Sequence, residues 1–260
     1  MMGAMSAAEI AVCPECGGSG WRRADRGGIS AVERCECMAS TRATRLLETA
    51  NIPPLYRHAT FDNFSTQPDN PVTHRILQTA MTISASYARE YPYGTKKLGL
   101  MFIGDPGTGK THLAVAVMKR LIARGFECVF FDYQNLLERI RSSYDQASGA
   151  AQREAYQTAL DCEVLVLDDL GAHRVSDWVE DTITSLITYR YNNNKPLITT
   201  TNLRDAEAGD ASLSGGVGTE LTSRYYLTER IGSRARSRLF EMCRTISTRG
   251  VEDYRVRKNR

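Results

Sequence analysis

The chain has 260 residues, of which 42% are hydrophobic and 24% charged, and its 33 Lys and Arg side chains outnumber its 30 Asp and Glu by three. This is the composition of an ordinary globular protein, and it excludes a disordered, collagen-like or coiled-coil chain. No run approaches the roughly 18 apolar residues of a membrane span, and the N-terminus lacks the apolar stretch of a signal peptide. We therefore expect a cytoplasmic protein with no membrane partner.

Four of the seven cysteines lie near the N-terminus in two close pairs. Cys13 and Cys16 form a C-P-E-C motif, and Cys35 and Cys37 form a C-E-C motif. Two such pairs can complete a tetrahedral Zn²⁺ site, and a metal would explain how so small and polar a segment folds. The alternative is a redox C-x-x-C motif, which normally precedes a helix in a βαβ unit that is absent here. The sequence predicts a zinc-binding domain over residues 1–39.

The next segment, residues 40–73, is predicted to be a linker. A helical pattern over 39–50 ends before Pro53 and Pro54, and the Q-P-D-N-P sequence interrupts the chain again. Proline lacks the backbone N–H that a continuing helix needs.

Three aromatic residues lie inside this linker: Tyr56, Phe61 and Phe64. We expect Phe61 and Phe64 to dock the linker on the following domain. For Tyr56, docking and coverage of a nucleotide base both remain open.

Residues 74–260 form the predicted main domain, in which strand patterns alternate with helical patterns. Continuous apolar runs, typical of parallel strands buried on both faces, predict strands over 98–104, 127–132, 163–169 and 196–202. Helical spacing of apolar residues predicts helices over 74–91, 111–125, 133–160 and 176–190. The remainder is expected to be largely helical and basic. This alternation predicts an α/β fold with a parallel sheet and helices on both faces.

A phosphate-binding loop follows the first predicted strand of this domain. Residues 104–111 read G-D-P-G-T-G-K-T, a complete Walker A motif between a strand and a helix. Its glycines let backbone N–H groups face phosphate oxygens, Lys110 can reach the β- and γ-phosphates, and Thr111 can bind Mg²⁺. The predicted ATP-binding residues are Gly104, Asp105, Pro106, Gly107, Thr108, Gly109, Lys110, Thr111 and His112.

Polar residues end two later strands and complete the predicted site. V-L-V-L-D-D (164–169) has the form of Walker B, in which Asp168 would hold Mg²⁺ and Asp169 would polarise the attacking water. Asn202 ends the strand of residues 196–202 and would lie beside Asp168 at the carboxyl edge of the sheet, where it could orient that water. A turn following each strand is the structural alternative.

These motifs resemble those of AAA+ ATPases with a three-layer sandwich. I-P-P-L-Y-R, T-F-D-N-F, L-D-D-L-G-A, G-S-R-A-R-S-R-L-F-E-M-C and E-D-Y-R, which span residues 52–257, resemble the bacterial replicative helicase loaders of the DnaC/DnaI type. The IstB-like transposition helper ATPases share nearly all of these motifs. Some loaders carry a small zinc-binding N-terminal domain that binds the helicase, so the cysteine pairs favour a loader.

The resemblance implies roles for two arginines and a set of partners. Arg238 matches the arginine finger that reaches the ATP of a neighbouring subunit, with Arg234 as the runner-up, and Arg255 matches the sensor 2 residue of its own subunit. The implied partners are a replicative helicase hexamer, single-stranded DNA, and further copies of the chain in an ATP-dependent oligomer or spiral. Candidate DNA contacts on the helical region after the second strand are Arg139, Arg141 and Tyr144.

Two other functions remain open from sequence. The chain could be an IstB-like helper that binds duplex DNA in transposition. It could also be a nucleotide-binding scaffold with little hydrolysis, because Asp169 is shorter than the Glu that many proteins of this fold carry at that position.

Overall fold

The structure is a computed structural model that describes residues 13–26, 29–142, 149–172, 176–205 and 226–258. Within these residues the main sheet has five strands in the order β4-β5-β6-β3-β7. All neighbouring strands of this sheet run parallel. The strands are β3 (Gly99–Ile103), β4 (Cys128–Asp132), β5 (Val164–Asp168), β6 (Leu197–Thr201) and β7 (Cys243–Ser247). The predicted parallel α/β sheet is therefore confirmed.

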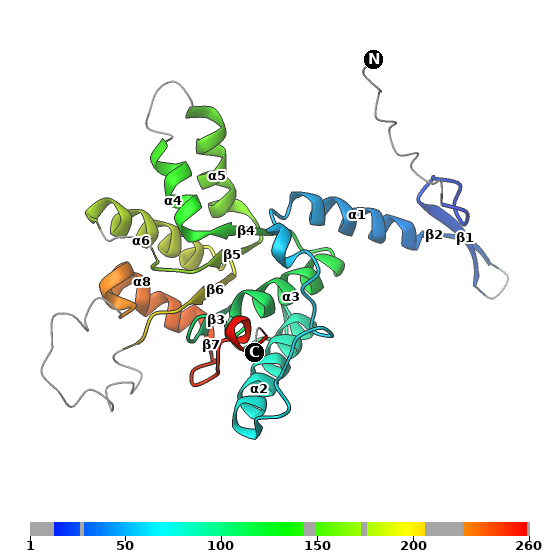
Figure 1. Ribbon diagram of the computed structural model, residues 1–260. Coiled ribbons are helices and arrows are strands. Elements are labelled where there is room, and N and C mark those ends of the chain that lie inside the picture. Colours follow the sequence, from blue (N-terminus) through cyan, green and yellow to red (C-terminus); the bar gives the residue numbers. More distant parts are fainter. Residues whose placement is uncertain (1–12, 27–28, 143–148, 173–175, 206–225, 259–260) are drawn as a thin grey trace, which may run out of the picture.

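Helices cover both faces of the sheet, as Figure 1 shows. Alternate residues of β3 enter different cores: Leu100 and Phe102 pack with α2 and α3, whereas Met101 and Ile103 pack with the other helices. The first core uses α2 (Pro71–Glu90) and α3 (Lys110–Ala123). The second uses α4 (Tyr133–Ser142), α5 (Gly149–Asp161), α6 (Asp177–Asn192) and α8 (Thr228–Met242). The result is a three-layer sandwich.

Strand β7 is the part of the sheet that the sequence did not predict. Its sequence, C-R-T-I-S, has no apolar run, because β7 is an edge strand that pairs with β3 alone. Arg244 and Thr245 are exposed there, while Cys243 and Ile246 are buried. The expectation that the end of the chain is largely helical was wrong at this strand, and the short α9 (Tyr254–Lys258) follows it.

The N-terminal cysteine segment contains a hairpin that the sequence also did not predict. Strands β1 (Trp21–Arg26) and β2 (Ile29–Arg34) pair antiparallel, and α1 (Glu36–Thr49) follows directly. Figure 1 shows the hairpin at the far end of α1, away from the sheet. Among the described helices, none is long and apolar enough to cross a lipid bilayer.

The segment after α1 packs on the sheet domain. The backbone N–H of Phe130, on edge strand β4, donates to Ala50 O at 2.9 Å, and the 3₁₀ turn η1 (Pro54–Tyr56) comes next. Tyr56, Phe61 and Phe64 are partly buried against the core that α2 and α3 share. The boundaries of the proposed domains and linker remain a prediction.

Candidate functional site

The phosphate loop connects β3 to α3. Gly107 and Gly109 have φ values of 72° and 89°, a left-handed conformation that glycine adopts without the strain of a side chain. Helix α3 begins immediately afterwards, with Leu113 N donating to Gly109 O at 3.0 Å. The loop therefore places the N-terminus of a helix, with its partial positive charge, at the carboxyl edge of the sheet.

Lys110 is held inside this loop. Its side chain is only 6% exposed, and its Nζ donates to the carbonyl of Asp105 at 2.7 Å. Burial lowers the pKa of Lys110 to about 8, against the opposing effect of the nearby Asp169, Asp105 and Asp168 carboxylates. An ammonium that is poorly solvated gains much from a phosphate partner, so this lysine is suited to bind anions.

Two hydroxyl groups hold Asp168 at the end of β5. Thr111 Oγ1 donates to Asp168 Oδ1 at 2.9 Å, and Thr200 Oγ1 donates to the same oxygen at 2.6 Å. Burial raises the pKa of Asp168, and both hydroxyls oppose that rise by stabilising the carboxylate. The structure thus brings Thr111 and Asp168, the two predicted Mg²⁺ ligands, into direct contact.

Thr200 is a site residue that the sequence analysis missed. It lies on β6, two residues before Asn202, and its oxygen accepts the backbone N–H of Asp169 at 2.9 Å while its hydrogen goes to Asp168. One threonine therefore holds the Asp168 carboxylate and the backbone of Asp169. Because residues two apart on a strand share a face, the T-T-T-N sequence contained the signal that could have identified it.

Asp169 turns away from regular strand geometry. Its φ is 56°, unusual for a residue with a side chain, and Asn202 Nδ2 donates to its Oδ1 at 2.8 Å. Asn202 was expected beside Asp168, but its hydrogen bond is to Asp169. Burial, together with the neighbouring Asp132 carboxylate, raises the pKa of Asp169. The pair of Asp169 and Asn202 is placed to bind a polar group, such as water, above the phosphate loop.

A cavity of about 540 Å³ joins these residues to the segment after α1. Tyr56 and Phe64 line it, whereas Phe61 packs on the core. His112 Nε2 contacts Thr60 O at 2.8 Å, and the rings of His112 and Phe64 lie 5.3 Å apart. The cavity is therefore bounded by the phosphate loop at one end and by an apolar and aromatic segment at the other, an arrangement suited to the phosphates and the base of a nucleotide. The remaining lining includes Leu55, His58, Ala59, Asn63, Asp132, Asp168, Asp169, Thr200, Asn202, Tyr254 and Arg255.

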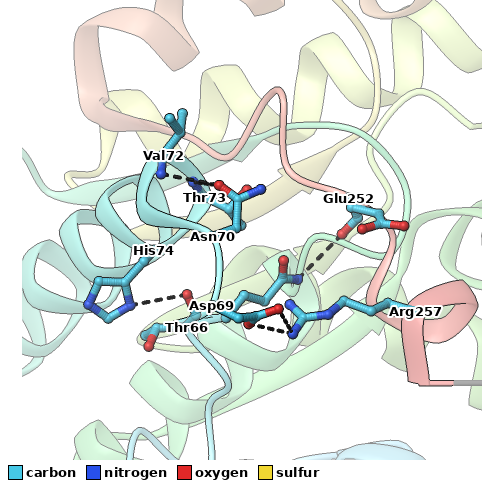
Figure 2. Close-up of polar contacts among 9 residues, drawn as sticks. Thr66, Asp69, Asn70, Val72, Thr73, His74, Glu252 and Arg257 are labelled. Carbon is cyan, nitrogen blue, oxygen red and sulfur yellow. Dashed lines mark hydrogen bonds and ion pairs between the residues drawn. The ribbon is translucent and has the colours of Figure 1, made fainter. Parts of the chain in front are cut away.

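Arg255 reaches the same cavity from α9. The helix is held on the phosphate loop by Tyr254 N, which donates to Gly107 O at 3.1 Å. On its outer side, Arg257 donates to both carboxylate oxygens of Asp69, at 2.5 and 2.6 Å, as Figure 2 shows. Arg255 therefore lines the cavity of its own chain, and its sensor 2 role remains a prediction.

Arg238 does not line the cavity of its own chain. Its guanidinium lies over the ring of Tyr191 at 5.9 Å, and its NH1 donates to Arg234 O at 3.1 Å. The side chain is half-buried, and its Nε finds no hydrogen-bond partner among the described residues. Arg234 is exposed, whereas Arg236 pairs with the buried Asp205. A role for Arg238 or Arg234 at the ATP of another subunit is compatible with these positions.

Two of the three candidate DNA contacts can be located. Arg139 and Arg141 are exposed on α4. Tyr144 lies outside the described residues.

The four N-terminal cysteines converge on one point. Their sulfur atoms all lie within 4.8 Å of one another, with 3.7 Å between Cys13 and Cys35 and 3.4 Å between Cys16 and Cys37. A tetrahedral Zn²⁺ site with Zn–S bonds of about 2.3 Å separates its sulfurs by roughly 3.8 Å, so the spacing fits this ion.

Gly20 joins the two cysteine pairs through its backbone. Its N–H donates to Cys16 Sγ at 3.3 Å, and its carbonyl accepts from Cys35 N at 2.8 Å. The Gly20 N–H lowers the pKa of Cys16 to about 6, while the hydrogen bond with Cys16 raises the pKa of Cys37. The Cys16 thiol thus ionises more readily than the Cys37 thiol, and a bound cation would favour the thiolate of Cys37.

Comparison with known proteins agrees with this geometry. The family model of IstB-like ATP binding proteins matches residues 32–216, which includes the Walker A and Walker B motifs. The chain belongs to this family. Its fold and its structural neighbours place it among the AAA+ proteins, and ATP is its expected ligand.

Individual relatives point in the same direction. The uncharacterised protein YqaM of Bacillus subtilis is 28% identical over 82% of this chain, but the match spans only 61% of YqaM. The replicative helicase loader DnaC of Escherichia coli K12 is 23% identical over 71% of this chain and 72% of its own length. A crystal structure of the DnaC helicase loader superposes with a TM-score of 0.56 and 32% identity, covering 75% of this chain and 99% of that chain.

Proposed function

We propose that this chain is an ATP-dependent loader that binds a hexameric replicative helicase and delivers it onto single-stranded DNA during replication initiation. The observation that carries the proposal is the 32% identity to the DnaC helicase loader across 99% of that chain. The Walker A loop and the carboxylates facing it supply the nucleotide chemistry that such a switch needs. ATP binding and hydrolysis would serve as the switch, and the remodelled helicase would be the product.

Each group around the cavity has a distinct part in ATP hydrolysis under this proposal. Thr111 and Asp168 would hold Mg²⁺, which when bound neutralises charge on the phosphates. Lys110 would leave the Asp105 carbonyl for the β- and γ-phosphates. Asp169 and Asn202, joined at 2.8 Å, would orient the attacking water. Thr200 would keep both residues in place, since it donates to the Asp168 carboxylate and accepts from the backbone N–H of Asp169.

Two arginines would complete the site in an assembled oligomer. Arg255 lines the cavity of its own chain and would contact the γ-phosphate. Arg238 lies on α8, outside that cavity, and would supply a positive charge to the ATP of the adjacent subunit. An arginine finger supplied in trans is worth about 10³–10⁵ in rate. Hydrolysis would then depend on self-association.

The zinc-binding unit is the part that we assign to helicase capture. It lies at the far end of α1, so it can reach a partner while the cavity stays free (Figure 1). Single-stranded DNA would bind the sheet domain, and exposed Arg139 and Arg141 on α4 are candidates for its backbone.

A second function, that of a transposition helper ATPase on duplex DNA, is favoured by the family match itself, since that family is described as IstB-like. The two functions differ in partner and in the form of DNA. A nucleotide-binding scaffold with little turnover is the third outcome, because the shorter Asp169 must reach further toward the water.

One experiment separates these functions. The full chain is tested for capture of a replicative helicase hexamer and of a transposase, and its ATPase rate is measured with single-stranded and with duplex DNA. The loader predicts helicase capture and stimulation by single-stranded DNA. Lys110→Ala should abolish turnover without loss of capture, which separates the ATPase from the zinc unit. Capture of the transposase with stimulation by duplex DNA would replace the loader by the helper, and the absence of turnover with either DNA would leave a scaffold.

A further inference from the structure

The segment that follows β7, residues 248–254, packs against the phosphate loop. Thr248 N donates to Ile103 O at 2.8 Å, Gly250 N to Asp105 Oδ2 at 3.5 Å, and Tyr254 N to Gly107 O at 3.1 Å. Figure 1 shows β7 and the C-terminal helix beside β3, although they lie more than a hundred residues further along the chain. The residues after β7 thus form the outer wall of the loop.

Thr248 is the member of this wall that reaches furthest inward. Its exposure is 0%, and its Oγ1 lies 2.8 Å from Thr108 Oγ1 inside the Walker A motif. Thr108 Oγ1 donates its one hydrogen to Asp105 O at 2.9 Å, so the Thr248 hydroxyl must be the donor of the pair. The Asp105 carbonyl also accepts from Lys110 Nζ at 2.7 Å. A chain of hydrogen bonds therefore runs from Thr248 through Thr108 and Asp105 to Lys110.

Gly104 shows how closely Thr248 approaches the loop. Unlike Gly107 and Gly109, Gly104 does not have a left-handed backbone, so its conformation does not require glycine. A Cβ atom at Gly104 would lie 2.1 Å from Thr248 Oγ1 and 3.0 Å from the Thr248 carbonyl carbon. The first glycine of this Walker A motif is therefore needed here to admit Thr248.

We propose that Thr248 is a positioning residue for the phosphate loop, acting through Thr108 on the Asp105 carbonyl and hence on Lys110. Thr248 is not itself a lining residue of the cavity. Thr248 lies beyond residues 32–216, which the family model matches, and it belongs to no Walker motif. The proposal deepens the proposed function and rests on its nucleotide site, but it requires only ATP binding. A chain that binds ATP without hydrolysing it, or that loads no helicase, can still confirm it.

A threonine that merely stabilises the fold would behave differently. Thr199 is the matched case, because it is also 0% exposed and its Oγ1 donates to a strand carbonyl, Leu167 O, at 2.9 Å. It is not a lining residue of the cavity. Replacing Thr199 by valine removes one buried hydroxyl bond of comparable burial without touching the phosphate loop.

The test compares the Mg²⁺–ATP affinity and the thermal midpoint of Thr248→Val, Thr248→Ser and Thr199→Val. Loss of one buried hydrogen bond is typically worth enough to weaken binding by about fivefold to tenfold. We expect that loss for Thr248→Val, near-normal affinity for Thr248→Ser, and normal ATP affinity for Thr199→Val despite a similar fall in thermal midpoint. Wild-type ATP affinity in Thr248→Val, or an equal loss in Thr199→Val, would overturn the proposal.

A double-mutant cycle with Thr108 tests the route of the effect. If Thr248 acts through Thr108, Thr248→Val should cost nothing further in ATP affinity once Thr108→Val is present. Fully additive losses would mean that Thr248 acts by another path and would contradict the relay. If Thr248→Val fails to fold, Thr108→Val and Thr248→Ser still test the proposal. The hydrogen-bond chain from Thr248 to Lys110 requires weakened ATP binding in Thr108→Val and normal ATP binding in Thr248→Ser.

Discussion

The N-terminal cysteine region (residues 13–37) and the sheet domain differ in what can stabilise each of them. In residues 13–37, only Gly20 and Cys35 are buried among the residues whose exposure the structure describes. In β3 and β6 every residue is buried. The first region cannot offset the entropy of folding by removing apolar surface from water, whereas the second can. We therefore expect the thiol cluster, with a bound Zn²⁺, to do in one region what an apolar core does in the other.

The sheet domain nevertheless uses polar links of its own. Arg190 is completely buried on α6, where it donates to backbone carbonyls that lie just before the start of β5 and β6. Asp69 pairs with Arg257 at the surface. The cysteine cluster, Arg190 and the Asp69–Arg257 pair can be ranked by how strongly the local fold depends on each. We expect this dependence to be greatest for the cysteine cluster and smallest for the Asp69–Arg257 pair. The ranking can be tested one member at a time.

Removal of zinc should have the largest effect. The purified chain should contain about one Zn²⁺, and a chelator or Cys16→Ser should unfold the β1–β2 hairpin, because structural zinc units of this size do not fold without metal. In a Trp178→Phe background, the fluorescence of Trp21 reports this loss. ATP binding and the main thermal transition should persist, since the hairpin lies away from the sheet (Figure 1).

The matched control for the zinc prediction is Cys128→Ala, which removes a buried thiol outside the cluster. This variant should keep its zinc and its Trp21 signal. A chain that contains no zinc, or a hairpin that keeps its Trp21 signal after chelation, would contradict this prediction. It would mean that the cysteine region, like the sheet domain, folds without a metal.

The contrast between the two regions also explains what sequence could predict. Apolar runs such as V-L-V-L in β5 identify buried strands directly, and the cysteine spacing identified a cluster that the structure brings within 4.8 Å. The β1–β2 hairpin and β7 were missed because each has an exposed face and so lacks such a run. For β7, the pairing partner β3 is distant in the sequence, so no local pattern specifies the strand.

The nucleotide site divides in the same way. The Walker motifs specify Lys110 and Asp168 locally, since their chemistry is set by a short continuous pattern. Thr200 and Thr248 make contacts to residues 32 and 140 positions away in the chain. The T-T-T-N sequence offered a signal for Thr200, but no local pattern contains Thr248. Asn202 was expected beside Asp168, and its actual partner, Asp169, depends on the left-handed turn that follows β5.

Replacement of Arg190 should have an effect on stability between those of zinc removal and of the Asp69–Arg257 pair. Its NH1 donates to Ala159 O at 2.8 Å and to Cys162 O at 3.1 Å, and its NH2 donates to Pro196 O at 2.7 Å. Arg190→Met keeps an apolar stem but leaves these buried carbonyls without their donor. We expect a loss of about 3 kcal/mol or more in the free energy of unfolding, measured by urea denaturation. Arg89→Met, at an exposed position of α2, is the control and should change little. An equal stability of both variants would show that the core alone holds this edge of the sheet.

The Asp69–Arg257 pair should have the smallest effect, and it should act on the cavity rather than on the fold. The side chains are 62% and 31% exposed, and such surface pairs contribute little to stability. The pair joins the residue before the N-cap of α2 to α9 (Figure 2). Helix α9 also carries Arg255, which lines the cavity. Asp69→Asn should leave the thermal midpoint unchanged but speed nucleotide release by about twofold to fivefold, because α9 is freed on its outer side.

Charge reversal decides whether the Asp69–Arg257 attraction itself produces this effect. Asp69→Arg and Arg257→Asp should each speed release of a fluorescent nucleotide in stopped flow, and the double variant should recover part of the wild-type rate, since the opposite charges face each other again. High salt should reduce the difference between Asp69→Asn and the wild type, because a pair this exposed is screened. If the double reversal releases nucleotide faster than either single variant, the Asp69–Arg257 attraction does not slow release. In that case α9 is held by its contacts with the phosphate loop alone.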